Sequence, residues 1–119
     1  MDVPGAAAAG CAQLAGRLPG ELDGRDRRDT APASPRTAAW GDPAVVLRCG
    51  VARPAGLTGS EVVEVDGVGW VLAERRRAYV FTTSDLATYV QVLVPRSTPR
   101  SAATAPLVDL AAPVSASLG

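Results

Sequence analysis

Short apolar runs separated by turn residues fill the second half of the chain. Residues 61–65 and 68–74 flank Asp66-Gly67, a strong hairpin signal because a type I′ turn needs positive φ at both central positions. Two more runs rich in β-branched and aromatic residues follow at 79–83 and 88–94. The pattern predicts a meander of three or four antiparallel strands.

Two specific predictions concern this meander: the faces of its last strand and the exposure of one of its turns. Strand geometry places successive side chains on alternating faces, which gives one face to Val90, Val92 and Val94 and the other to Tyr89, Gln91 and Leu93. Arg75-Arg76-Arg77 links the second strand to the third. We predict that these three arginines are exposed on a hairpin turn and belong to no functional site.

In the first half of the chain, the clearest strand follows a turn. Gly41-Asp42-Pro43 combines three turn-forming residues. The run after it, which includes Val45, Val46 and Leu47, is short, largely apolar and closed by Gly50, which predicts a strand over Val45–Cys49 that is buried on both faces. Arg48 interrupts this run, and an arginine in such a strand more often extends past the sheet edge or pairs with a carboxylate than binds an anion.

Helix-forming residues occupy both ends of the chain. Residues 5–18 have high helix propensity apart from their glycines, and Pro19-Gly20 ends the run. The apolar face of this helix comprises Ala7, Cys11, Leu14 and Leu18. A second helix is predicted over residues 106–114, beginning at Pro106 and kinked or shortened by Pro113.

The segment 21–36 joins the first helix to the strands. It alternates in charge and becomes proline-rich at 31–35, which predicts a short exposed edge strand and a loop, with the charges as a solvated edge rather than a binding patch. Residues 37–40 are expected to form another short strand that places Trp40 against the core. The predicted fold class is α+β: an antiparallel sheet of four to six strands with an N-terminal and a C-terminal helix packed on one face.

Length and charge limit the function classes. At 119 residues the chain is long enough for a single globular domain, 1–119, and too short for two. Twelve arginines balance twelve acidic residues, so there is no overall positive field and we expect no nucleic-acid binding. The chain has no Lys, Ile, Asn or His, which is typical of a GC-rich genome. No apolar run has the length of a membrane span.

Candidate catalytic groups are scarce. The absence of His excludes Ser-His-Asp and Cys-His sites. Glu61, Glu64 and Asp66 are the closest carboxylates, and beside a hairpin they are expected to be ordinary solvated groups. Trp40 and Trp70 are expected to be core residues, with an aromatic ligand platform as the alternative. We therefore expect no catalytic residue, no cofactor and no metal site.

Several motifs resemble one uncharacterised family. The central motif is Ala39-Trp-Gly-Asp-Pro-Ala-Val-Val-Leu-Arg-Cys-Gly-Val51. Others are spread over nearly the whole chain: Cys11-x-x-Leu14, Leu18-Pro19, Arg53-Pro-x-Gly-Leu57, Val65-Asp-Gly-Val-Gly-Trp70, Tyr79-Val-Phe-Thr-Thr83 and Leu107-Val-Asp-Leu110. In these motifs the chain resembles domain of unknown function 3515 (DUF3515), a family of small exported or membrane-anchored actinobacterial proteins with no assigned activity.

The resemblance bears on the compartment and on the two cysteines. It implies an extracytoplasmic protein, membrane-anchored or secreted, whose signal or anchor is missing from residues 1–119; a cytosolic protein is the alternative. In an exported domain Cys11 and Cys49 are expected to form one disulfide that fastens the first helix to the strand after Gly41-Asp42-Pro43, whereas in the cytosol they would be two buried thiols. A zinc site is not expected, because the chain has no CxxC pair and no His.

Three functions remain open at this point. The first is a noncatalytic binding or interaction module of the cell envelope, with an envelope protein or a cell-wall component as partner. The second is a structural or assembly module of the envelope. The third is an enzyme that uses carboxylates or a redox disulfide, and we expect the chain not to be an enzyme.

Overall fold

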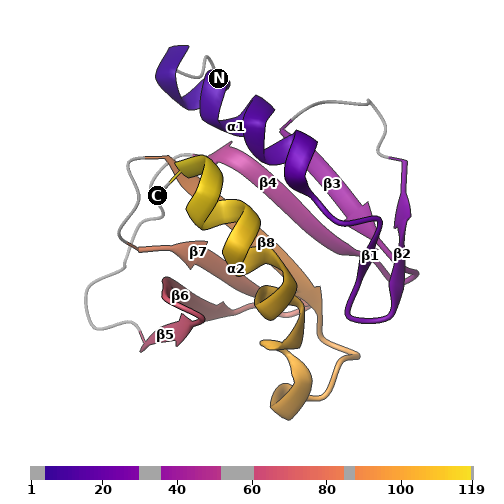
Figure 1. The fold of residues 1–119 in the computed structure, drawn as a ribbon. Helices are drawn as coiled ribbons and strands as arrows, with labels where there is room; N and C mark the ends of the chain where they lie inside the picture. The colour runs from indigo at the N-terminus through magenta and orange to yellow at the C-terminus, as the bar shows by residue number, and fades with distance from the viewer. Residues whose placement is uncertain (1–4, 30–35, 52–60, 85–87, 119) are drawn as a thin grey trace.

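An eight-stranded antiparallel sheet forms the centre of the fold (Figure 1). The computed structural model describes residues 5–29, 36–51, 61–84 and 88–118. The strands are β1 (Glu21–Leu22), β2 (Arg25–Arg28), β3 (Thr37–Trp40), β4 (Val45–Val51), β5 (Glu61–Val65), β6 (Val68–Glu74), β7 (Ala78–Thr83) and β8 (Tyr89–Pro95). Their order across the sheet is β1-β2-β3-β4-β8-β7-β6-β5. The two halves of the chain therefore meet at the antiparallel pair of β4 and β8.

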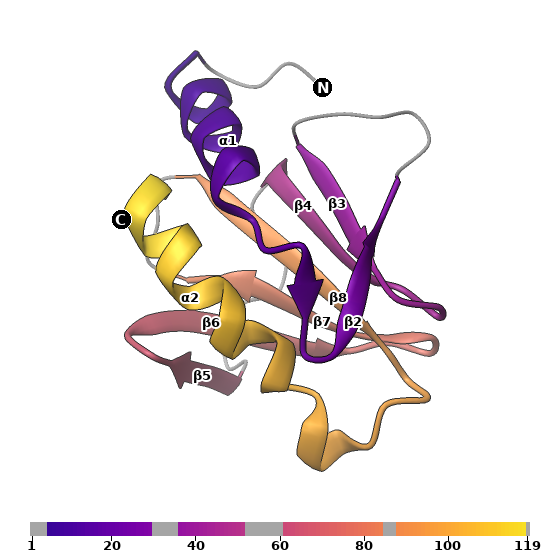
Figure 2. The same ribbon diagram turned by 45° about the vertical axis from the view of Figure 1, so that its right-hand side comes forward.

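Two helices lie on the same face of this sheet, as Figures 1 and 2 show. The first, α1 (Gly5–Arg17), contacts β4, and the second, α2 (Ala105–Leu118), contacts β5 and β6. The helices also contact each other at Gly10, where an added Cβ would overlap Cδ2 of Leu118. A short 3-10 helix, η1 (Arg100–Ala102), precedes α2. Within the described ranges no helix has both the length and the apolar character needed to cross a membrane.

The core fills the space between the helices and the sheet. Its largest fully buried side chains are Trp40, Trp70, Phe81, Leu14, Leu22, Leu47, Leu107 and Leu110. The predicted alternation in β8 is confirmed, because Val90, Val92 and Val94 are completely buried while the residues between them are half-buried. The predicted coverage of one sheet face by both helices is confirmed as well.

Strand β4 differs from its prediction in one respect. Val45, Leu47 and Cys49 are buried, whereas Val46 is half-buried and Arg48 is exposed. The strand therefore has one buried face, not two, because both helices lie on the same side of the sheet. Arg48 lies on that second face, beside Gln91 of β8.

The number of strands is also larger than the predicted four to six. The charged segment after α1 forms two short strands, β1 and β2, instead of one edge strand. Asp23 and Gly24 join them with positive φ angles of 49° and 76°, the backbone that a tight hairpin turn requires. The predicted proline-rich loop at 31–35 lies outside the described residues.

Two further predictions concern the second hairpin and α2. Asp66 and Gly67 have positive φ angles of 47° and 87° between β5 and β6, which confirms the predicted hairpin. Of the two effects predicted for Pro113, a kink or a shortened helix, the shortening is contradicted, because α2 continues through Pro113 to Leu118. Proline removes one backbone donor, but Leu110 and Val114 on either side are fully buried and hold α2 against the sheet.

Candidate functional site

The two cysteines form the expected disulfide. Cys11 of α1 and Cys49 of β4 are bonded, with a Cα–Cα distance of 5.7 Å. Their exposed fractions are only 1% and 3%. Catalytic disulfides exchange through accessible, reactive sulfur atoms, so this buried bond has a structural role. The side chain of Ala7, predicted on the same helix face, lies outside the described part of the chain.

Both tryptophans are core residues. Trp40 and Trp70 are completely buried, so neither presents a ring to a ligand. Trp40 Nε1 donates a hydrogen bond of 3.0 Å to the carbonyl oxygen of Pro19, which ties the end of β3 to the segment after α1. Trp70 Nε1 is buried without a hydrogen-bond partner in the structure as described.

The hairpin carboxylates whose side chains the structure describes are solvent-exposed. Asp66 lies in the turn between β5 and β6, Glu64 lies on β5, and both are exposed. The side chain of Glu61 is outside the described part of the chain. Among the described residues there is no group of three or more His, Cys, Asp or Glu side chains that could hold a metal ion.

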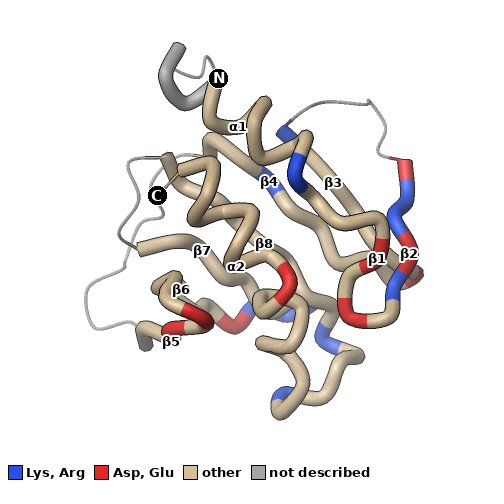
Figure 3. The backbone as a smooth tube through the Cα atoms, in the orientation of Figure 1, with Lys and Arg blue, Asp and Glu red and all other residues tan. Residues whose placement is uncertain are grey.

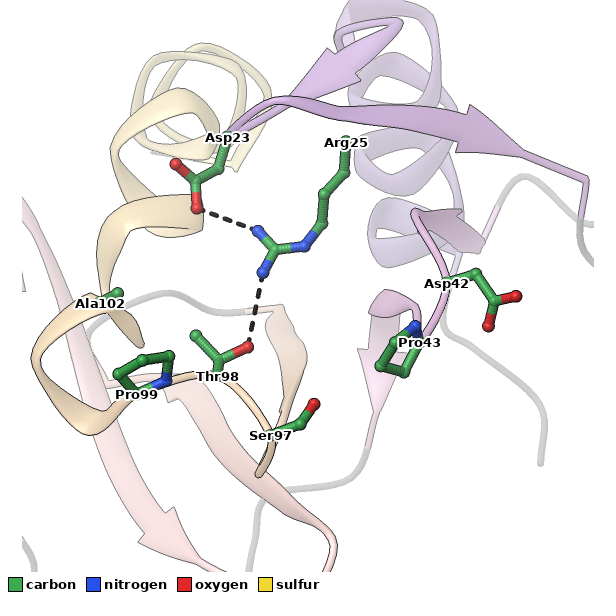
Figure 4. Close-up of a pocket in the computed structure, with 8 residues that line it drawn as sticks. All are labelled: Asp23, Arg25, Asp42, Pro43, Ser97, Thr98, Pro99 and Ala102. Atoms are coloured by element: carbon green, nitrogen blue, oxygen red, sulfur yellow. Dashed lines mark hydrogen bonds and ion pairs between the residues drawn. The ribbon is translucent and has the colours of Figure 1, made fainter.

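A hollow of about 380 Å³, lined by both polar and apolar residues, lies where three segments meet (Figure 4). The turn between β1 and β2, the turn between β3 and β4, and the segment from β8 to η1 supply its walls. Its lining residues are Asp23, Arg25, Asp42, Pro43, Ser97, Thr98, Pro99 and Ala102. These residues come from three separate parts of the sequence, so no motif predicted the hollow.

Arg25 is the central side chain of this hollow, and it is already paired. Its Nη1 lies 2.9 Å from Asp23 Oδ2, and its Nη2 lies 3.4 Å from Thr98 Oγ1. The carboxylate of Asp42 points away from this guanidinium in Figure 4. The backbone N–H of Asp23 donates to Asp109 Oδ2 of α2 at 3.1 Å. Arg25 and Asp23 therefore fasten the first hairpin to the rest of the fold, and the guanidinium serves in these structural contacts.

A charged surface region lies beside the hollow, and we call it the arginine end. It comprises Glu74, Arg75, Arg76, Arg77, Arg96 and Arg100. The strand register brings the segments 74–77 and 96–100 together, since Ala78 pairs with Pro95 and the N–H of Arg96 donates to the carbonyl of Arg77 at 3.1 Å. The segment 96–100 thus lines the hollow with Ser97, Thr98 and Pro99 and presents an arginine on each side of them.

Glu74 is the carboxylate at the centre of the arginine end. Arg96 Nη1 lies 3.8 Å from Glu74 Oε1, and Arg100 Nη1 donates to the same oxygen. Arg96 also lies over the ring of Tyr79, 4.6 Å from the centroid, a cation–π arrangement that holds the guanidinium in place. In Figure 3 arginines of this group appear in blue at the lower end of the sheet, near the turn that precedes α2.

The other three arginines of the arginine end have the predicted exposure. Arg75, Arg76 and Arg77 are exposed at the turn between β6 and β7, which confirms the expected hairpin turn. Among the described residues none of their guanidinium groups has a hydrogen-bond or ion-pair partner. The six residues of the arginine end together carry five positive charges and one negative charge.

Exposed apolar side chains are few in the described ranges. The large hydrophobic residues that are exposed there are Val62 of β5, at 61%, and Val108 of α2, at 51%. Neither belongs to the arginine end, whose surface is therefore formed by charged groups.

Comparison with known proteins gives a family and no function. The family model described as protein of unknown function (DUF3515) matches residues 1–119. No curated protein and no solved structure matches the chain.

Proposed function

Because the chain belongs to the DUF3515 family, whose function is unknown, we propose a function from its structure: a noncatalytic binding module of the actinobacterial cell envelope. In this proposal the domain is exported, lies outside the cytoplasmic membrane as a secreted or membrane-anchored protein, and binds an envelope protein or a cell-wall component. The partner binds at the arginine end.

The charge of the arginine end is the observation that carries the proposal. The whole chain is neutral, yet this region concentrates five of its twelve arginines around one glutamate. Folding normally pairs charged groups or separates them, because like charges that lie close together repel one another. Three adjacent guanidinium groups without a partner among the described residues are available to bind a negatively charged surface.

The disulfide supports the location. Disulfides form and persist in oxidising compartments and are rare in the cytosol. Cys11 and Cys49 are bonded in the core and connect the first helix to the central strand of the sheet. A bond in that position fits a small domain that folds outside the cytoplasm.

Binding to isolated cell envelope tests the proposal. The variant is Arg75→Ser, Arg76→Ser and Arg77→Ser, which removes three exposed charges. The matched control is Arg17→Ser, Arg28→Ser and Arg48→Ser, which removes the same charge from exposed positions that do not contact Glu74. Purified proteins are sedimented with washed envelope of the source organism, and the bound fraction is measured across a salt series.

We expect wild type and the control to be retained and the Arg75, Arg76 and Arg77 variant to be lost from the pellet. Equal retention of all three proteins would contradict binding at the arginine end. Failure of wild type to be retained, at salt low enough to preserve electrostatic contacts, would contradict the binding function itself.

A further inference from the structure

The arginines of the arginine end do not converge on one point. Arg75, Arg76 and Arg77 are consecutive and exposed, and the side chains of Arg96 and Arg100 are 41% and 60% exposed. A site for a single small anion gathers its donors in a hollow that excludes water. Arg25 is the arginine that lines the hollow beside the arginine end, and it is hydrogen-bonded to Asp23 and Thr98. The arrangement suits a ligand that carries several charges in a row.

We infer that this ligand is a linear phosphodiester polymer of the envelope, bound along the turn between β6 and β7 and the segment 96–100. The inference rests on the proposed function, because it names the partner of the same surface. Guanidinium groups present a planar fork of donors that matches two phosphate oxygens at once. Three of the five guanidinium groups have no competing partner among the described residues.

The surface favours a polymer over a lipid bilayer. Proteins that bind at a membrane surface commonly insert apolar side chains between the headgroups as well as contacting their charges. The exposed large apolar residues of the described ranges, Val62 and Val108, lie outside the segments 74–77 and 96–100. A flexible chain of phosphates needs no such residue, because it can follow the two turns and place successive phosphates against successive arginines.

Counterion release gives the expected salt dependence. Four net charges predict a slope of about −3 for log K against log salt, so affinity falls roughly 50-fold between about 50 mM and about 200 mM salt. After Arg75→Ser, Arg76→Ser and Arg77→Ser one net charge remains, and the same salt change lowers affinity only about threefold. Slope and affinity therefore change together in this variant.

The probe is purified poly(glycerol phosphate), labelled at one end and titrated with the whole protein while fluorescence anisotropy is recorded. Two other ligands separate the sources of negative charge. Polygalacturonate is a linear polymer of carboxylates, and vesicles of phosphatidylglycerol present phosphodiester headgroups on a bilayer. The control is again Arg17→Ser, Arg28→Ser and Arg48→Ser, which has the same net charge as the test variant.

We expect wild type to bind poly(glycerol phosphate) more tightly than the other two ligands, with the salt slope above. The test variant should lose more than about tenfold in affinity at low salt, and the control should stay within about twofold of wild type. Equal losses in the test variant and the control would overturn the inference, as would tighter binding to polygalacturonate or to the vesicles.

This result is separable from the test of the proposed function. If wild type is retained by envelope through Arg75, Arg76 and Arg77 but does not bind poly(glycerol phosphate), the inference fails and the proposed function stands. If neither ligand nor envelope is bound, both fail.

Discussion

Removing the disulfide is expected to cost about 4 kcal/mol of unfolding free energy. Cys11 and Cys49 are 38 positions apart, and for a loop of that length the chain-entropy model gives about 4 kcal/mol. The perturbation is Cys11→Ala with Cys49→Ala, which also removes two buried sulfur atoms. With an unfolding entropy of about 2 cal/mol/K per residue over 119 residues, the loss corresponds to a fall of about 15 °C in Tm.

Urea unfolding of three samples measures this effect: oxidised wild type, wild type with reductant, and the double variant. Reduced wild type keeps both sulfur atoms, so it separates the cross-link from the change in packing. We expect oxidised wild type to be the most stable sample and the double variant the least. A difference under about 1 kcal/mol between oxidised and reduced wild type would refute the reasoning. Two free thiols by intact mass, before reductant is added, would refute the bond itself.

Replacing Arg75, Arg76 and Arg77 together with Ser should leave Tm within a few degrees in a thermal melt, because exposed substitutions usually change stability by under about 0.5 kcal/mol each. A large fall would mean that one guanidinium makes a stabilising contact. Leu14→Ala, at a position 1% exposed, should lower the unfolding free energy by about 3 kcal/mol in urea, and a loss below about 1 kcal/mol would show that α1 packs loosely. Trp40→Phe removes the donor to the Pro19 carbonyl and should cost about 1 kcal/mol or more in the same assay; an unchanged midpoint would show that this bond adds nothing.

A hairpin could be predicted where the turn residues and the apolar pattern of the flanking strands indicate the same structure. Asp66-Gly67 lies between two β-rich runs, and the hairpin formed there as expected. Asp23-Gly24 is the same dipeptide with the same positive φ angles, yet its hairpin was missed. The strands beside it, β1 and β2, are short and charged, so the apolar pattern that supports the turn signal was absent.

The arginine end could be predicted only in part. The exposure of Arg75, Arg76 and Arg77 follows from their place between two strands, and it is confirmed. Their position next to Arg96 and Arg100 depends on the register of β7 against β8, in which Ala78 pairs with Pro95. Register is set by packing across the whole sheet, and residues some twenty positions apart in sequence carry no local signal of it. The sequence predicts that these three arginines belong to no functional site, and the proposed function departs from that prediction.

Hydrogen–deuterium exchange on the protein bound to soluble envelope polymer locates the binding surface directly. We expect slower exchange of the backbone amides at 75–77, 96–98 and 100, with amides at the opposite turn, Asp66 and Gly67, unchanged. Slower exchange confined to that turn or to the edge strand β5, with the two arginine segments unaffected, would contradict binding at the arginine end.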